Sequence, residues 1–201
     1  VTENGIPRPK IVSRSNTAEY VSIEKSIRAL LTDQDIYSAM FENNLIDNAD
    51  GVYSLFQHCE RYKSYPPFVS FNNKQRKTLL IQLYYDGLGI TNPLSDAATI
   101  HNSGMFYFSL LNLPPRFNSS VVNVFQVAMC NSLDLKDRDS MAAVLKYIGD
   151  EITHLTNTGM EIVTADGLVT VRAILAQFTA DNLGFNQVFG FIESFSCDYC
   201  C

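Results

Sequence analysis

The sequence lacks any run of about eighteen consecutive apolar residues, the length that a helix needs to cross a membrane. It also lacks a hydrophobic signal core near its start, where residues 1–10 (VTENGIPRPK) are largely polar. Both absences argue against a membrane protein. The first residue is valine, and we expect the chain to be a piece of a longer protein. Because 46% of its 201 residues are hydrophobic, we expect one domain with a sizeable core and a smaller annex.

Cysteines and basic residues are scarce and unevenly placed. The five cysteines are an odd number and three of them lie in the last five residues, which does not suit a disulfide framework. We therefore expect a reducing compartment. Residues 81–201 carry five Lys or Arg against twelve Asp or Glu, whereas residues 1–80 carry ten against nine. A broad phosphate-binding surface is therefore not expected in residues 81–201.

The first third of the chain predicts an arm and a helical annex. Residues 1–16 combine prolines with basic side chains and predict an extended arm, which either touches phosphate or is a solvated tail. Residues 17–67 predict the annex. The apolar spacing of residues 18–31 fits a helix, Asp33 is placed to cap a second helix, and a third apolar cluster spans residues 52–62.

Residues 68–201 predict a sheet. Residues 77–86 (KTLLIQLYYD) form a nearly continuous apolar run rich in β-forming residues, as expected of a strand buried on both faces. A second run spans residues 104–113, where prolines at 114–115 stop it, and a third spans residues 120–130. Because the connections between these runs are short, we expect three antiparallel strands.

A long helix and a further strand follow these three runs. Asp137 or Asp139 is placed to cap a helix whose apolar residues recur at helical spacing until Gly159 ends it. Asp166–Gly167, between two alternating runs, predicts a small hairpin insertion. Residues 171–181 predict another apolar strand, and this one also ends in an aspartate.

The order of these elements predicts an α/β fold with a mixed sheet. A helix between two strands of one sheet is long enough for a right-handed crossover, which makes the two strands parallel. We therefore expect three antiparallel strands, a crossover helix and a fourth strand parallel to the first. The carboxyl ends of the first and fourth strands then lie at one edge of the sheet, which brings Asp86 and Asp181 together.

Two neighbouring carboxylates suggest chemistry with a divalent cation. They repel each other unless a cation lies between them, and oxygen-only ligands suit Mg²⁺ or Mn²⁺. Such ions support two-metal phosphoryl transfer on a phosphodiester. Each residue also has a structural interpretation: Asp86 before a glycine is typical of a turn, and Asp181 before Asn182 is typical of a helix cap.

Three segments together resemble a known enzyme family. They are YYDGLGITNPLS (residues 84–95), FYFSLLNLPPRFNSS (residues 106–120) and FTADNLGFNQVFGFIESFSCDYCC (residues 178–201). They resemble the RNase H-like transposase core of eukaryotic cut-and-paste DNA transposons. The similarity is to the group with a zinc-binding insertion after the second aspartate, broadly the Transib and CACTA/Chapaev-like relatives of the V(D)J recombinase. It extends from about Tyr65 to Cys201.

The resemblance implies roles for particular residues. Asp86 matches the first and Asp181 the second metal-binding aspartate of the family's acidic triad, with Mg²⁺ or Mn²⁺ as the metal. Cys201 looks like the first cysteine of the zinc site, whose other ligands, like the third acidic residue, would follow it in the full-length parent. Cys197 and Cys200 form a separate Cys-x-x-Cys pair, and a local metal site that uses them is the alternative.

Other positions are weaker candidates. Gly87 stands where the family often has a second acidic residue, which leaves a degenerate copy open. Glu193 is expected to pack or cap rather than to bind metal. Lys74, Arg76 and Lys77, just before the first strand, are the best candidates for phosphate contact, against a solvated turn. The sequence has three histidines, His58, His101 and His154. Their spacing does not suit a shared metal ion, so structural or surface roles are expected.

These features lead to three functional hypotheses. The first is a piece of a DNA transposase that hydrolyses phosphodiesters and transfers strands at transposon ends. The parent protein is expected to be nuclear, with a homodimer as its candidate assembly and no membrane partner. This piece alone is expected to be inactive. The second is a domesticated or decayed relative that binds DNA or protein without catalysis. The third is a cellular nuclease of the same fold, which would need no zinc insertion.

Overall fold

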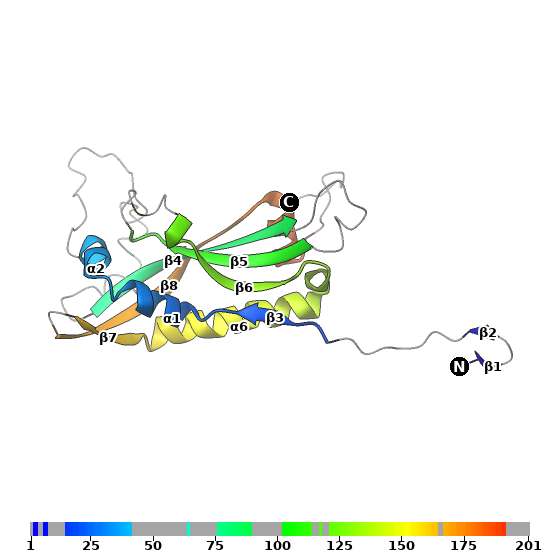
Figure 1. Ribbon diagram of the computed structural model, residues 1–201, viewed down its shortest axis with the longest axis horizontal. Helices are drawn as coiled ribbons and strands as arrows, with labels where there is room; N and C mark the ends of the chain where they lie inside the picture. Colours follow the sequence, from blue (N-terminus) through cyan, green and yellow to red (C-terminus); the bar gives the residue numbers. More distant parts are fainter. Residues whose placement is uncertain are drawn as a thin grey trace.

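The computed structural model describes residues 15–41, 76–89, 102–113, 121–164 and 167–191, together with 2–3, 6–7, 64 and 117. Most of them belong to one curled sheet and the helices packed against it (Figure 1). The strands of this sheet are β3 (Ala18–Tyr20), β4 (Arg76–Gly89), β5 (Asn102–Leu110), β6 (Phe125–Asn131), β7 (Met160–Thr164) and β8 (Gly167–Ala180). The α-helices are α1 (Ile23–Leu30), α2 (Gln34–Phe41), α6 (Arg138–Asn157) and α7 (Asn182–Phe189). Two further short strands, β1 (Thr2–Glu3) and β2 (Ile6–Pro7), pair antiparallel with each other.

The sheet is mixed, with the strand order β3-β6-β5-β4-β8-β7. β4, β5 and β6 are antiparallel neighbours, and β8 lies parallel to β4. The chain reaches β8 from β6 through α6, which runs along one face of the sheet (Figure 1). The predicted order of three antiparallel strands, a crossover helix and a strand parallel to the first is therefore confirmed.

The main core lies between this face of the sheet and the helices. Alternate residues of β4, among them Ile81 and Leu83, point into it and pack with Phe106 and Phe108 of β5. The contribution of α6 is the predicted apolar stripe, of which Met141, Ile148, Ile152 and Leu155 are buried. Asp137 is the cap, because its side chain accepts a hydrogen bond from the Ser140 backbone N–H at 3.0 Å.

The described part of the predicted annex shares this core. The helix expected over residues 18–31 is shorter, because residues 18–20 form β3 and pair antiparallel with β6. Ser22 then caps α1 by accepting a hydrogen bond from the Lys25 backbone N–H at 3.2 Å. Asp33 caps α2, as predicted, through bonds from the backbone N–H groups of Asp35 and Ile36. The apolar cluster at residues 52–62 lies outside the described residues.

The hairpin is part of the main sheet rather than an insertion. β7 pairs with the first residues of β8, from Thr164 opposite Gly167 to Met160 opposite Val171. β8 then continues without a break to Ala180, so the second strand of the hairpin and the predicted fourth strand are one element. Val169, Val171 and Ala173 are buried at alternate positions across the junction, and pairing with β4 continues from Thr170 to Ala180.

Within the described ranges, no helix is both long and apolar enough to span a membrane.

Candidate functional site

Asp86 lies inside β4 rather than at its end. It pairs with Met105 of β5, and the pairing continues through Gly87 opposite Gly104 to Gly89 opposite Asn102. The prediction that this strand ends at Asp86 is therefore wrong, because pairing with β5 keeps Gly87 to Gly89 in the antiparallel ladder. On the other side of β4, the pairing with β8 stops one residue before Asp86.

Asp181 caps helix α7. Its backbone is still extended, with φ −66° and ψ 170°, and its Oδ1 accepts a hydrogen bond from the Gly184 backbone N–H at 2.6 Å. The structural interpretation of this residue is therefore correct. The cap uses one carboxylate oxygen.

A β-bulge brings the two aspartates into register. Ile81 is opposite Leu175, but Gln82 is opposite Gln177, so β8 contains one extra residue at this point. From the bulge onward, partners on β4 and β8 are 95 positions apart, and the last pair is Tyr85 with Ala180. Asp86 and Asp181 are the next residues after this last pair and are likewise 95 positions apart. Without the bulge, the side chains of this part of β8 would point to the opposite face.

The two aspartates line a common hollow of about 480 Å³. Neighbouring strands lie about 4.8 Å apart, and Asp86 and Asp181 each follow the last paired residue of their strands. Both aspartates are exposed. The other lining residues are Tyr84, Tyr85, Tyr107, Val124, Thr179 and Ala180. The structure therefore brings together the two residues that the sequence singled out.

Tyr107 interacts electrostatically with Asp86. Burial raises the pKa of the Tyr107 hydroxyl, and the negative charge of Asp86 raises it further. The hydroxyl donates a hydrogen bond to Met105 Sδ at 2.9 Å.

A polar network supports the floor of the hollow. Gln82 donates hydrogen bonds to Gln177 Oε1 and Thr179 Oγ1, both at 3.2 Å, and accepts one from the Tyr84 hydroxyl. Ser109 on β5 lies within 3.5 Å of the same two β4 side chains. These contacts join three strands on one face and restrict the rotamers of the side chains next to the carboxylates.

The donor chemistry of the hollow fits a hard divalent cation. No Lys, Arg or His lines it among the described residues, so the repulsion between the two carboxylates is not offset by a basic side chain. The described part of the chain contains no group of three or more His, Cys, Asp or Glu that could hold a metal. Mg²⁺ is usually held by one or two carboxylates plus waters and substrate phosphates, so two aspartates are a sufficient protein contribution.

The predicted phosphate contacts are not part of this hollow. The ammonium of Lys77 lies 5.6 Å from the ring centroid of Phe41. It is nine residues before Asp86 on the same strand, which corresponds to about 30 Å. Arg76 begins β4, and Lys74 lies outside the described residues.

The remaining candidates fall mostly outside the described residues. His154 is exposed on α6. The predicted positions that the structure does not describe are Cys197, Cys200, Cys201, Glu193, His58 and His101.

The sequence pattern did not indicate Tyr84 and Tyr107 as parts of the site. Residues 77–86 were interpreted as buried on both faces, which holds only for the first half of the strand. In the second half, Gln82 and Tyr84 alternate with buried Leu83 and share a face with Asp86. That alternation was a signal, but the apolar character of the whole run concealed it.

No family model matches the chain, and no curated protein matches it at a significant level. Fold and site define it as a mixed α/β protein with two aspartates lining a hollow where the pairing of the parallel strands β4 and β8 ends.

Proposed function

We propose that this chain belongs to the RNase H-like phosphoryl-transfer proteins and is the core of a DNA transposase, which hydrolyses phosphodiesters and transfers strands at transposon ends. The supporting observation is the position of Asp86 and Asp181, which follow the last paired residues of the parallel strands β4 and β8 and line one hollow. The sheet order β6-β5-β4-β8 with its crossover helix is compatible with such a fold.

In this mechanism the two carboxylates would hold Mg²⁺ or Mn²⁺, and the ion would supply charge stabilisation for the attacking and leaving oxygens of the phosphodiester. Asp86 and Asp181 provide the anionic ligands. The bond from Gly184 fixes the rotamer of Asp181, so this ligand is oriented before metal or substrate binds.

A non-catalytic DNA- or protein-binding relative is the second candidate. Two observations favour it: Gly87 follows Asp86 where a second acidic residue is often found in the family, and Asp181 already has a structural role as a helix cap. In this case the hollow would keep its shape without holding a metal. The zinc ligands, the nuclear location and the homodimer remain predictions.

Binding of Mn²⁺ tests the proposal without depending on turnover. The chain is titrated with Mn²⁺, and the electron paramagnetic resonance signal of the free ion measures binding. Asp86→Asn and Asp181→Asn should each weaken binding at least ~10-fold, because even mutations of residues that only support a metal ligand typically cost that much affinity. Asn also caps helices, so Asp181→Asn should preserve α7.

Asp139→Asn is the matched control, because Asp139 is exposed on α6 and is not part of the hollow. In the intact protein, the same two variants should abolish metal-dependent nicking of DNA. Undiminished Mn²⁺ binding in both hollow variants would refute the metal site. Unchanged nicking in both would refute the catalytic assignment.

A further inference from the structure

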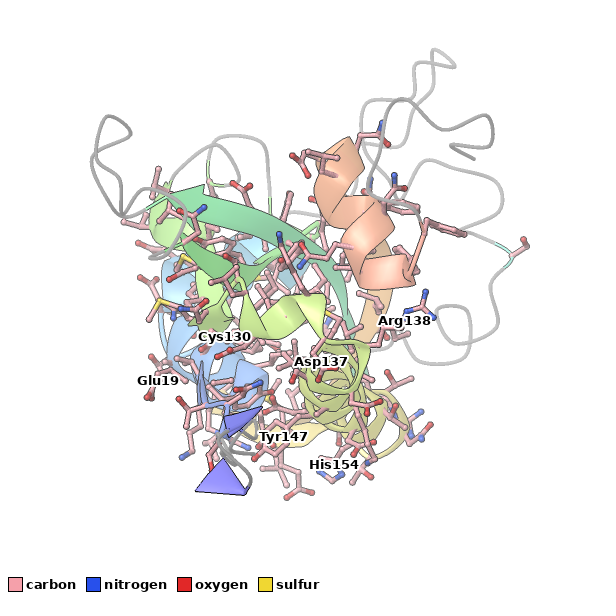
Figure 2. All side chains as sticks on the ribbon, turned by 90° about the vertical axis from the view of Figure 1, so that its right-hand side faces the viewer. Glu19, Cys130, Asp137, Arg138, Tyr147 and His154 are labelled. Atoms are coloured by element: carbon pink, nitrogen blue, oxygen red, sulfur yellow. The ribbon has the colours of Figure 1, made fainter. Side chains whose placement is uncertain are left out.

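A second hollow lies where α6 begins and α7 ends. It has a volume of about 400 Å³, and its lining includes Lys136, Arg138, Phe189 and Phe191. We call this surface the α6–α7 groove. The guanidinium of Arg138 lies 3.5 Å from the carbonyl oxygen of Gly190, the residue that ends α7, and Figure 2 shows this side chain beside the helix.

Among the described residues, two charged side chains line the groove, and both are cationic. Lys136 and Arg138 are exposed there, and Asp139, which is also exposed, does not line the groove. Asp134 lines a different hollow, between β3 and α6. Asp137 caps α6 by accepting bonds from Ser140. The groove therefore favours an anionic ligand, although the second half of the chain is acidic overall.

The other lining feature is an exposed aromatic surface. Phe189 and Phe191 are 50% and 55% exposed. Phe185 holds both rings in place, since its centroid lies 4.4 Å from that of Phe189 and 6.3 Å from that of Phe191. Phe178 of β8 packs edge-on against Phe189 at 5.3 Å. Packed rings that keep exposed faces are suited to stack with planar ligands such as nucleobases.

Helix α7 connects the groove to the acidic hollow. Asp181 caps its first turn and Gly190 ends it, so these two residues, one at each site, lie about 12 Å apart along an eight-residue helix. The Tyr85 hydroxyl donates a hydrogen bond to Gln187 at 2.9 Å and ties the helix to β4, next to Asp86. About three to four nucleotides of a stacked strand, at ~3.4 Å each, span this separation.

We propose that the α6–α7 groove binds a short segment of single-stranded DNA next to the acidic hollow. Lys136 and Arg138 contact its phosphates, and Phe189 and Phe191 stack with its bases. The assignment to DNA rests on the proposed function. Single-stranded DNA fits better than a duplex because base pairing and stacking cover the base faces in a duplex. It fits better than an acidic peptide because only the nucleic acid uses both the cations and the rings.

The test measures binding of a dye-labelled oligothymidylate of about ten nucleotides to the full chain by fluorescence anisotropy, with EDTA present. Lys136→Gln with Arg138→Gln should weaken binding and reduce the slope of log affinity against log salt by about 1.4, the value for two phosphate contacts on a single strand. The control is Lys25→Gln with Lys146→Gln, which removes two exposed positive charges elsewhere.

The rings are tested separately. Phe189→Leu and Phe191→Leu keep apolar side chains but remove the stacking faces, and each should weaken oligothymidylate binding roughly 10-fold. Tyr147→Leu, which removes another exposed ring of the surface, should not. Circular dichroism of each variant verifies that the fold is retained.

Three results would overturn the groove proposal. They are equal losses in the groove and control variants, a duplex that binds as tightly as the single strand, or displacement of the oligonucleotide by a polyglutamate peptide of the same charge. Failure of the proposed function gives a different pattern. Because EDTA removes divalent ions, Asp86→Asn should bind the oligonucleotide normally, so the groove can be supported even if the hollow binds no metal.

Discussion

Glu151 of α6 holds the N-terminal segment against the body of the protein, and its replacement by glutamine should be strongly destabilising. Its Oε1 accepts hydrogen bonds from Ser22 Oγ at 2.6 Å and the Glu24 backbone N–H at 3.1 Å. Its Oε2 accepts bonds from the Tyr20 hydroxyl and, at 3.0 Å, from the Ile23 backbone N–H. One carboxylate thus joins β3 and the first turn of α1 to α6.

The expected loss follows from these four bonds. Glutamine presents a single acceptor oxygen, so Glu151→Gln removes the two bonds at the other oxygen and places an NH₂ group against two donors. At about 1–1.5 kcal/mol for each bond, the free energy of unfolding should fall by about 2–3 kcal/mol. Tyr20→Phe, which removes one donor, should cost about 1 kcal/mol.

The effect should also depend on pH. Burial would raise the pKa of Glu151, but the bonds from Ser22, Tyr20 and the two backbone N–H groups outweigh it, so its pKa is lowered. A lowered pKa in the folded state stabilises the protein above the pKa of the unfolded state, about 4.3, and this stabilisation is lost as the pH falls through the folded value. The difference between wild type and Glu151→Gln should therefore shrink below about pH 4.

Urea unfolding followed by circular dichroism at neutral and acidic pH measures both quantities. Glu161→Gln is the matched control, because Glu161 is exposed on β7 and should change stability by less than about 0.5 kcal/mol. The reasoning is refuted if Glu151→Gln unfolds at the same urea concentration as the control, or if its deficit is independent of pH.

Two further predictions concern the core. Gly104→Ala should lower the free energy of unfolding in urea by about 1–3 kcal/mol, because the added Cβ would lie 2.3 Å from Leu135 Cδ1 and 2.9 Å from the Tyr85 hydroxyl. Gly149→Ala, which has open space around it, is the control and should not destabilise. Equal stabilities of the two variants would contradict the close packing. Burial, and to a smaller extent the charge of Asp134, raises the pKa of the Cys130 thiol to about 11. The thiol should therefore resist alkylation by iodoacetamide at pH 8 until urea unfolds the chain. Mass spectrometry of the Cys130 peptide measures this, and rapid labelling of the folded protein would contradict it.

The elements that could be predicted from the sequence are those that local patterns determine. The apolar runs of β4, β5 and β6, the stripe of α6 and the caps Asp33 and Asp137 were predictable, because each depends on residues close in the chain. Gly159, with φ +76°, ends α6 as its position suggested. The parallel placement of β8 followed from the length of the crossover.

The elements that could not be predicted depend on distant partners. Residues 18–20 have helix-like apolar spacing, but pairing with β6 makes them a strand. Gly87 resembles a turn residue, but pairing with Gly104 keeps it in β4. The bulge beside Gln82 leaves no signal in a single sequence, although it sets the register of the two aspartates. The crossover therefore predicted that the two aspartates lie at one edge of the sheet, whereas their exact register, the tyrosines and the polar network around them were not predictable.

The first turn of α7 shows how tightly the acidic hollow depends on a residue without a side chain. A Cβ at Gly184 would lie 2.8 Å from Asp181 Oδ1 and 3.0 Å from Tyr85 Cδ1, so any larger residue would displace the cap or the strand beneath it. The same close approach lets the Gly184 N–H bind the carboxylate and places α7 against β4. The orientation of Asp181 beside Asp86 and the position of the aromatic rings at the other end of the helix therefore have a common cause, which is why a defect at Gly184 should impair both proposed sites together.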